Sequence, residues 1–144
     1  MKKIFVNEEW CLGCHLCEYY CTFANSGLTD MAQALKNKKI RSGIHLEACG
    51  DVTYAVSCRH CPDPICVRGC LTGALSVKDG VVCIDKDKCI GCYTCVGLCP
   101  FGAVVPDGEK AVQKCAHCME KGEIPLCVQN CPNRAIVYTE EAER

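Results

Sequence analysis

Cysteine is the residue type in this sequence whose number and spacing point most directly to chemistry. The chain has 144 residues, of which 18 are cysteine. Sixteen of them fall into four groups, and three residues separate the last two cysteines of every group. The groups are Cys11, Cys14, Cys17 and Cys21; Cys58, Cys61, Cys66 and Cys70; Cys89, Cys92, Cys95 and Cys99; and Cys115, Cys118, Cys127 and Cys131. This internal repeat of potential thiolate ligands predicts several metal sites in one short chain.

The third group has the spacing C-x2-C-x2-C-x3-C and is followed by Pro100. This is the run of bacterial ferredoxins, in which three cysteines hold one [4Fe-4S] cluster and the fourth binds a neighbouring cluster. Zinc is the main alternative, because structural zinc sites pair two C-x2-C knuckles across a longer loop. Three thiolates at successive two-residue gaps crowd a single tetrahedral ion, so zinc stays open mainly for the second and fourth groups.

Composition narrows the class of protein further. Leu, Ile, Val and Phe together number only 33, which makes a thin core for this length and leaves metal sites to stabilise the fold. The formal net charge is −1, and without a basic run nothing indicates a nucleic-acid partner. Asn7, Glu8 and Glu9 interrupt any signal-peptide core, and no apolar stretch is long enough to span a membrane. We therefore expect a cytoplasmic protein whose thiols are kept reduced and bind metal.

Short apolar stretches and turn residues lie between the cysteine groups, which is typical of small hairpins. Asp79-Gly80 is a strong hairpin signal, and Pro106-Asp107-Gly108 predicts a longer turn. The expected strand pairs are 73–77 with 81–84, 102–105 with 111–113, 44–48 with 52–56, and, from opposite ends of the chain, 3–6 with 135–138. Residues 28–39 are expected to form a polar, lysine-rich helix.

These elements predict an α+β fold built from two pseudo-symmetric bacterial-ferredoxin-like units of short β-hairpins, short helices and cluster-binding loops. Residues 1–27 and 106–144 would form one unit, and residues 57–105 would form the other. Each unit would hold two clusters, and residues 28–56 would be an inserted helix and hairpin.

The second group has a four-residue gap before its third cysteine, where the first and third groups have two residues, and the fourth group has an eight-residue gap there. With these spacings the sequence resembles the four-cluster iron–sulfur subunits of molybdenum, tungsten and nickel enzymes. This family includes the beta subunits of dimethyl-sulfoxide-reductase-type enzymes. The segments 11–21 and 58–66 look most similar to the carbon monoxide dehydrogenase iron–sulfur protein and to the small subunits of tungsten aldehyde oxidoreductases. The resemblance implies four [4Fe-4S] clusters with crossed ligation. The implied ligand sets are Cys11, Cys14, Cys17 with Cys131; Cys115, Cys118, Cys127 with Cys21; Cys58, Cys61, Cys66 with Cys99; and Cys89, Cys92, Cys95 with Cys70.

The sequence contains no recognisable catalytic set and no Gly-x-Gly-x-x-Gly for a nucleotide cofactor. We therefore expect a non-catalytic electron-transfer subunit of a soluble anaerobic oxidoreductase. The resemblance implies a large catalytic subunit as partner, with a flavin or NAD subunit, a ferredoxin or a hydrogenase as the second partner. The alternatives are a free polyferredoxin serving several enzymes and a self-associating, filament-forming subunit of a formate-dehydrogenase or hydrogenase-type complex. The docking surface is expected where the first or second group meets solvent.

A few residues outside the ligand sets carry their own expectations. Trp10 is expected to pack over the first cluster. Cys83 is expected to be a small buried hydrophobe, and Cys49 an exposed thiol at a turn. The histidines inside the cysteine groups are expected to be exposed, or to lie beside clusters without ligating them; they are His15, His60 and His117.

Overall fold

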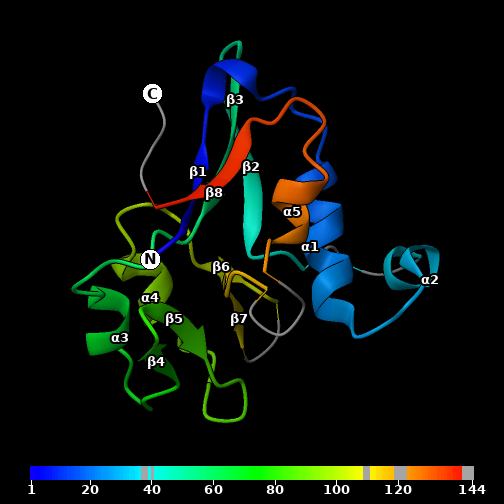
Figure 1. Cartoon of the computed structure of the whole chain (residues 1–144). Helices are drawn as coiled ribbons and strands as arrows, with labels where there is room; N and C mark the ends of the chain where they lie inside the picture. Colours follow the sequence, from blue (N-terminus) through cyan, green and yellow to red (C-terminus); the bar gives the residue numbers. More distant parts are fainter. Residues whose placement is uncertain (37–38, 40, 109–110, 119–122, 141–144) are drawn as a thin grey trace.

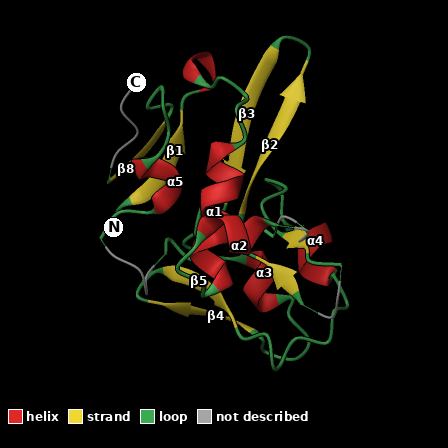
Figure 2. Cartoon of the chain, turned by 90° about the vertical axis from the view of Figure 1, so that its right-hand side faces the viewer, coloured by secondary structure: helices red, strands yellow, loops and turns green. Residues whose placement is uncertain are grey.

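Short strands paired in twos and short helices make up the chain in the computed structural model, which describes residues 1–36, 39, 41–108, 111–118 and 123–140 (Figures 1 and 2). Within these residues the helices are η1 (Glu8–Trp10), α1 (Leu16–Ser26), α2 (Met31–Leu35), α3 (Ile65–Arg68), α4 (Thr94–Leu98) and α5 (Leu126–Gln129). The strands are β1 (Lys3–Val6), β2 (Ile44–Cys49), β3 (Val52–Ser57), β4 (Leu75–Lys78), β5 (Val81–Ile84), β6 (Val105–Pro106), β7 (Val112–Gln113) and β8 (Ile136–Thr139). The α+β fold with repeated units is confirmed.

All four predicted strand pairings are present, each as an antiparallel two-stranded sheet. β1 pairs with β8 in the register Ile4 to Tyr138, so the first and last strands of the chain lie side by side (Figure 1). β4 and β5 turn at Asp79 and Gly80, whose φ angles of 49° and 78° fit the tight turn that this dipeptide favours. β6 and β7 are shorter than expected, with two residues each.

The segment between the first two cysteine groups was predicted only in part. The β2–β3 hairpin is present, and Cys49 at its turn is exposed, as expected. The predicted helix over 28–39 is too long, because the helix α2 begins only after Asp30. The Asp30 carboxylate caps it by accepting a hydrogen bond from the Ala32 N–H at 2.9 Å. Lys36 is already extended, and residues 37 and 38 lie outside the described residues.

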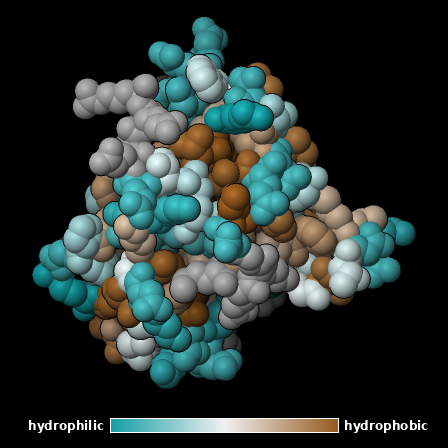
Figure 3. Space-filling model, viewed as in Figure 1, coloured by the Kyte–Doolittle hydropathy of each residue, from teal (hydrophilic) through white to brown (hydrophobic). Residues whose placement is uncertain are grey.

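Cysteine sulfurs take the place of hydrocarbon in much of the core. The buried cluster combines a few aliphatic side chains, such as Ile44, Val82 and Val112, with cysteines from all four groups. On the face seen in Figure 3, hydrophobic residues form small patches between hydrophilic ones. Among the described residues, no helix has the length and apolar character needed to cross a membrane.

The third cysteine of each group lies in a separate helix, and these four helices pack in two pairs. α1 packs against α5, and α3 packs against α4. Cys17, Cys66, Cys95 and Cys127 each lie in the first turn of one of these helices. The fold therefore places one buried thiol of each group at the start of a helix.

Candidate metal centres

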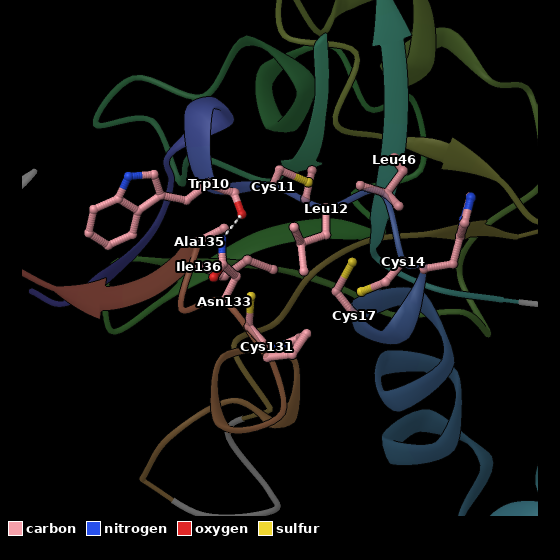
Figure 4. Close-up of a pocket in the computed structure, with 13 residues that line it drawn as sticks. Trp10, Cys11, Leu12, Cys14, Cys17, Leu46, Cys131, Asn133, Ala135 and Ile136 are labelled. Atoms are coloured by element: carbon pink, nitrogen blue, oxygen red, sulfur yellow. Dashed lines mark hydrogen bonds between the residues drawn. The ribbon is translucent and has the colours of Figure 1, made fainter. Parts of the chain in front are cut away.

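The first centre, called here the Cys11 site, consists of Cys11, Cys14, Cys17 and Cys131. The four residues line one cavity of about 340 Å³, part of it open to solvent (Figure 4). The first three come from the loop between η1 and α1 and the start of α1, and Cys131 follows α5. Leu46 and Ala55 of the β2–β3 hairpin complete the wall. The structure thus brings three cysteines of the first group together with the last cysteine of the fourth.

The Cys89 site repeats this arrangement with Cys70, Cys89, Cys92 and Cys95. These four residues line a second cavity of about 340 Å³. The Thr94 hydroxyl lies 3.4 Å from the Cys92 sulfur, and together with the backbone N–H groups this contact lowers the pKa of the exposed Cys92 thiol. Here the third group is joined by the last cysteine of the second.

The Cys115 site consists of Cys21, Cys115, Cys118 and Cys127, which line a larger cavity of about 1850 Å³, part of it open to solvent. The Cys21 sulfur accepts hydrogen bonds from the Gly43 N–H at 3.3 Å and from the Asn25 side-chain amide at 3.5 Å. The space widens because the walls also include residues of β5, among them the half-buried Cys83. Cys83 is therefore less buried than expected.

The Cys58 site consists of Cys58, Cys61, Cys66 and Cys99. Burial above all raises the pKa of the Cys66 thiol, and the charges of Cys58 and Cys99 add to this shift. The lysine Lys114 responds to the same three sulfurs. Cys61 is half-buried, and its membership of this site is based on the spacing of its group.

Left-handed backbone lets each cysteine loop turn back on itself. In the first and third groups Gly13 and Gly91 stand before the second cysteine with φ of 65° and 70°. In the second and fourth groups the same place is taken by His60 and His117, with φ of 44° and 55°. Histidine adopts this region more readily than most side chains, so the repeated C-x-H-C pattern is a variant of C-x-G-C.

The raised pKa values of the buried thiols indicate that a bound cation is needed to stabilise their ionised forms. None of the cysteines forms a disulfide. Burial raises the pKa of the Cys17 and Cys115 thiols to about 12, and neighbouring thiols add to the shift. Burial likewise raises the pKa of Cys127, with the charges of Cys115 and Cys21 contributing. Thiols held together in this way ionise readily only when metal compensates their charge. The donor sets therefore fit iron–sulfur clusters.

Buried histidine nitrogens fit the same cofactor. The side chain of His60 accepts a hydrogen bond from the Val82 N–H at its Nδ1, 2.9 Å away, so the ring proton resides on Nε2. That Nε2 and both ring nitrogens of His117 are buried without a hydrogen-bond partner among the described residues. Buried donors of this kind need an acceptor, and the sulfides of a bound cluster would provide one.

The expectations for the residues around the sites are met unevenly. His15 is exposed, as predicted, and pairs with Glu18 at 2.6 Å. His60 and His117 are buried, with 2% and 3% of their surface exposed. Trp10 lines the Cys11 cavity, but its indole ring points away from the sulfurs, and its carbonyl accepts a hydrogen bond from the Asn133 side chain at 2.8 Å (Figure 4). Sequence reasoning did not single out the buried Lys114, although its place directly before Cys115 was visible.

Comparison with known proteins identifies iron–sulfur relatives. Residues 51–141 match the 4Fe-4S dicluster domain, and residues 8–24 match a 4Fe-4S binding domain. An iron–sulfur protein of Rhodospirillum rubrum is 35% identical over 150 residues, which cover 92% of this chain and 79% of that protein. One polypeptide of the anaerobic dimethyl sulfoxide reductase of Escherichia coli (strain K12) is 31% identical over 149 residues, which cover 93% of this chain and 71% of that polypeptide.

Two further comparisons concern length and fold. The oxidoreductase-like protein AegA of Escherichia coli (strain K12) is 36% identical to this chain over 143 residues. The match covers 94% of this chain but only 21% of that protein, so the chain spans about a fifth of its length. The active-site complex BamBC of benzoyl coenzyme A reductase contains a polypeptide that superposes with a TM-score of 0.51 at 21% identity. That match covers 100% of this chain and 82% of the other, and it shows a shared fold.

Proposed function

Because the chain belongs to the 4Fe-4S dicluster domain family, we propose that this iron–sulfur electron-transfer subunit carries four [4Fe-4S] clusters that connect two redox partners. The observation that supports this most is that three cavities are each lined by three cysteines of one group and the last cysteine of another. Two-cluster ferredoxins use the same crossing. The Cys58 site would complete the set with Cys58, Cys61, Cys66 and Cys99. Bound clusters would supply one-electron chemistry, while the chain holds and insulates them.

Interactions between neighbouring sites support a linear order. The charge of Cys17 acts on Cys127, which links the Cys11 site to the Cys115 site. The charge of Cys58 acts on Cys115, which links the Cys115 site to the Cys58 site. Packing of α3 against α4 links the Cys58 site to the Cys89 site. In this proposal residues 1–27 with 106–144 hold the first two sites, residues 57–105 hold the last two, and residues 28–56 are an insert that covers the Cys11 cavity.

The Cys11 site and the Cys89 site, at the two ends of this linear order, each expose an apolar side chain between two of their cysteines. Leu12, between Cys11 and Cys14, is 65% exposed, and Ile90, between Cys89 and Cys92, is 61% exposed. The second group meets solvent in part, because Cys58 and Cys66 are buried whereas Cys61 and Cys70 are half-buried. The third group meets solvent more fully at its second cysteine, because Cys92 is exposed. We propose that each end docks one redox partner.

The first partner is proposed to be the large catalytic subunit of a soluble anaerobic oxidoreductase of the tungsten aldehyde oxidoreductase or carbon monoxide dehydrogenase type. The family resemblance supports this, and the name of the dimethyl sulfoxide reductase relative supports a place in a multi-chain enzyme. A ferredoxin, a hydrogenase or a flavin or NAD subunit would dock at the other end. No part of this proposal involves nucleic acid.

Metal analysis tests the cofactor content. Protein purified without oxygen should be brown and contain about 16 iron atoms and about 16 sulfides per chain, four of each per cluster. Zinc at two or more equivalents with little sulfide would refute the proposal.

Co-purification tests the role. A tagged chain isolated from anaerobic cells should bring one large catalytic subunit with it in a fixed ratio. A chain that elutes alone as a monomer and reduces several unrelated enzymes would instead be a free polyferredoxin. Elution as long concentration-dependent oligomers would identify a filament subunit, with the two apolar ends as its contacts.

A further inference from the structure

Two strands that each have a free edge border one groove. The groove has a volume of about 1280 Å³, part of it open to solvent, and its walls include every residue of β1 and residues 54–57 of β3. Successive residues of a strand point to opposite faces, so a groove that touches all of them follows the edge of the strand. β1 and β3 contact each other but belong to separate two-stranded sheets (Figure 2).

The pairing of β1 with β8 shows which backbone groups of β1 face its free edge. The Asn7 N–H donates a hydrogen bond to the Ala135 carbonyl at 2.8 Å, directly after the last pair of the two strands. Hydrogen-bonded and non-hydrogen-bonded pairs alternate along an antiparallel ladder. Ile4 and Val6 therefore direct their backbone N–H and C=O groups away from β8.

The same reasoning applies to β3. Leu46 of β2 stands opposite Ala55, and its N–H donates to the Glu18 carboxylate at 2.8 Å instead of to β3. The backbone groups of Ala55 therefore also point away from their partner strand. Among the described residues these outward groups of Ile4 and Ala55 have no backbone partner, although both residues are buried. Buried backbone groups of this kind need hydrogen-bond partners, and an added strand would supply them.

The charges of the groove favour an acidic occupant. Lys3 and Arg59 line it, and within the described part of the chain neither forms an ion pair; the Arg59 guanidinium instead lies over the Phe101 ring, 4.5 Å from its centroid. Glu140 also lines the groove, but its carboxylate lies 3.9 Å from the Met1 amino group. Two uncompensated cations therefore remain to meet carboxylates.

We propose that an extended, acidic segment of the redox partner at the Cys11 end lies in this groove as an added strand. The inference rests on the proposed function, because it needs a partner at that end. Ala55 lines both the groove and the Cys11 cavity, so a strand held here would fix the partner beside the first centre. Main-chain hydrogen bonds would supply affinity, and Lys3 and Arg59 would select acidic side chains.

Peptide binding to the anaerobically purified full chain tests the chemistry of the groove. The probe is a fluorescein-labelled hexapeptide in which glutamate alternates with valine, followed by fluorescence anisotropy. It should bind, and more weakly as salt is added. Lysine in place of glutamate, or N-methylation of every peptide amide, should weaken binding about tenfold or more. Equal binding of either altered peptide, or no binding of the glutamate peptide at millimolar concentration, would overturn the proposal.

Substitutions locate the binding site. Lys3→Gln should weaken binding of the glutamate peptide about threefold to tenfold. Lys2→Gln is the matched control, because Lys2 is exposed and does not line the groove. Val6→Pro removes an N–H that faces the groove and should weaken binding about fivefold, whereas Val6→Ala keeps that N–H. Iron content and circular dichroism show whether each variant is folded. Folded Lys3→Gln and Lys2→Gln proteins that bind the peptide equally would overturn the proposal, whatever the stability of Val6→Pro.

Cross-linking identifies the occupant. Tyr54 lines the groove, and its replacement by the photo-cross-linker benzoylphenylalanine is followed by mass spectrometry of the complex purified from anaerobic cells. A cross-link to an acidic segment of the catalytic subunit supports the proposal. A cross-link to a second copy of the chain, or to the chain's own residues 141–144, overturns it. Failure of the proposed function shows separately, as iron well below about 16 atoms in the unmodified chain.

Discussion

The imidazole rings of His60 and His117 meet edge to face, with their centroids 4.1 Å apart and their planes at 72°. The two residues occupy the same place in the second and fourth cysteine groups, and both have left-handed backbone. Tyr138 of β8 also packs edge to face on His117, at 5.4 Å between centroids. The contact therefore joins two equivalent loops and brings the Cys58 and Cys115 sites next to each other.

His117→Phe should keep the packing of this ring pair but remove the single N–H donor of the neutral His117 ring. We expect nearly full iron content, because every proposed ligand set already has four cysteines. We also expect a lower reduction potential for an adjacent centre, because a sulfide or thiolate loses a hydrogen bond that stabilises negative charge. A redox titration measures the shift. His15→Gln is the control, since His15 is exposed and lies at the Cys11 site, and it should leave the potentials of the Cys58 and Cys115 centres unchanged. Equal potentials for His117→Phe and the unmodified chain would contradict a donor role.

Gly43→Ala should destabilise the protein, because the new Cβ would overlap the backbone of Lys114 and Cys115. Overpacking of this kind costs about 1–3 kcal/mol, and here it also displaces a proposed ligand. We expect a lower Tm by circular dichroism and partial loss of iron. Gly97→Ala is the matched control: nothing lies within 4 Å of its Cβ, and it stands in α4, where alanine favours the helix by about 0.5–1 kcal/mol. A Gly43→Ala protein as stable as Gly97→Ala would argue against the close approach.

Cys99→Ala should release the centre held by Cys58, Cys61 and Cys66 and spare the rest of its own group. The charge of Cys99 acts on Cys66, whereas Cys70 lines the cavity of Cys89, Cys92 and Cys95. Iron should fall by about four atoms per chain. Alkylation followed by mass spectrometry identifies the released thiols. Cys83→Ala should retain all the iron. Selective labelling of Cys89, Cys92 and Cys95 in the Cys99→Ala protein would be incompatible with crossed ligation.

Removal of iron by a chelator under oxidising conditions should unfold the chain. The aliphatic core is small, and cysteine sulfurs form much of the buried cluster, so metal binding and folding are coupled. Circular dichroism should show loss of β structure and no cooperative thermal transition. A metal-free protein that melts near the temperature of the iron-loaded protein would show that hydrocarbon packing alone is sufficient.

Local sequence patterns predicted much of this fold. Asp79-Gly80 indicated its hairpin, because a two-residue turn depends only on the residues within it. The cysteine spacings indicated iron–sulfur chemistry for the same reason, since three cysteines of each proposed ligand set lie close together in the sequence. The predicted helix over 28–39 was too long because the Asp30 side chain caps the chain at a point that composition does not reveal.

The sequence by itself determined the kind of cofactor and the four cysteine groups proposed to supply its ligands, because both depend on residues a few positions apart. Only the tertiary structure decided which cysteines are buried and which are exposed. Cys58 and Cys66 of the second group are buried, whereas Cys92 of the third group is exposed, and this difference arises from packing between segments far apart in the chain, such as α3 against α4. The same long-range packing buries His60, His117 and Lys114, whose burial no local pattern predicts.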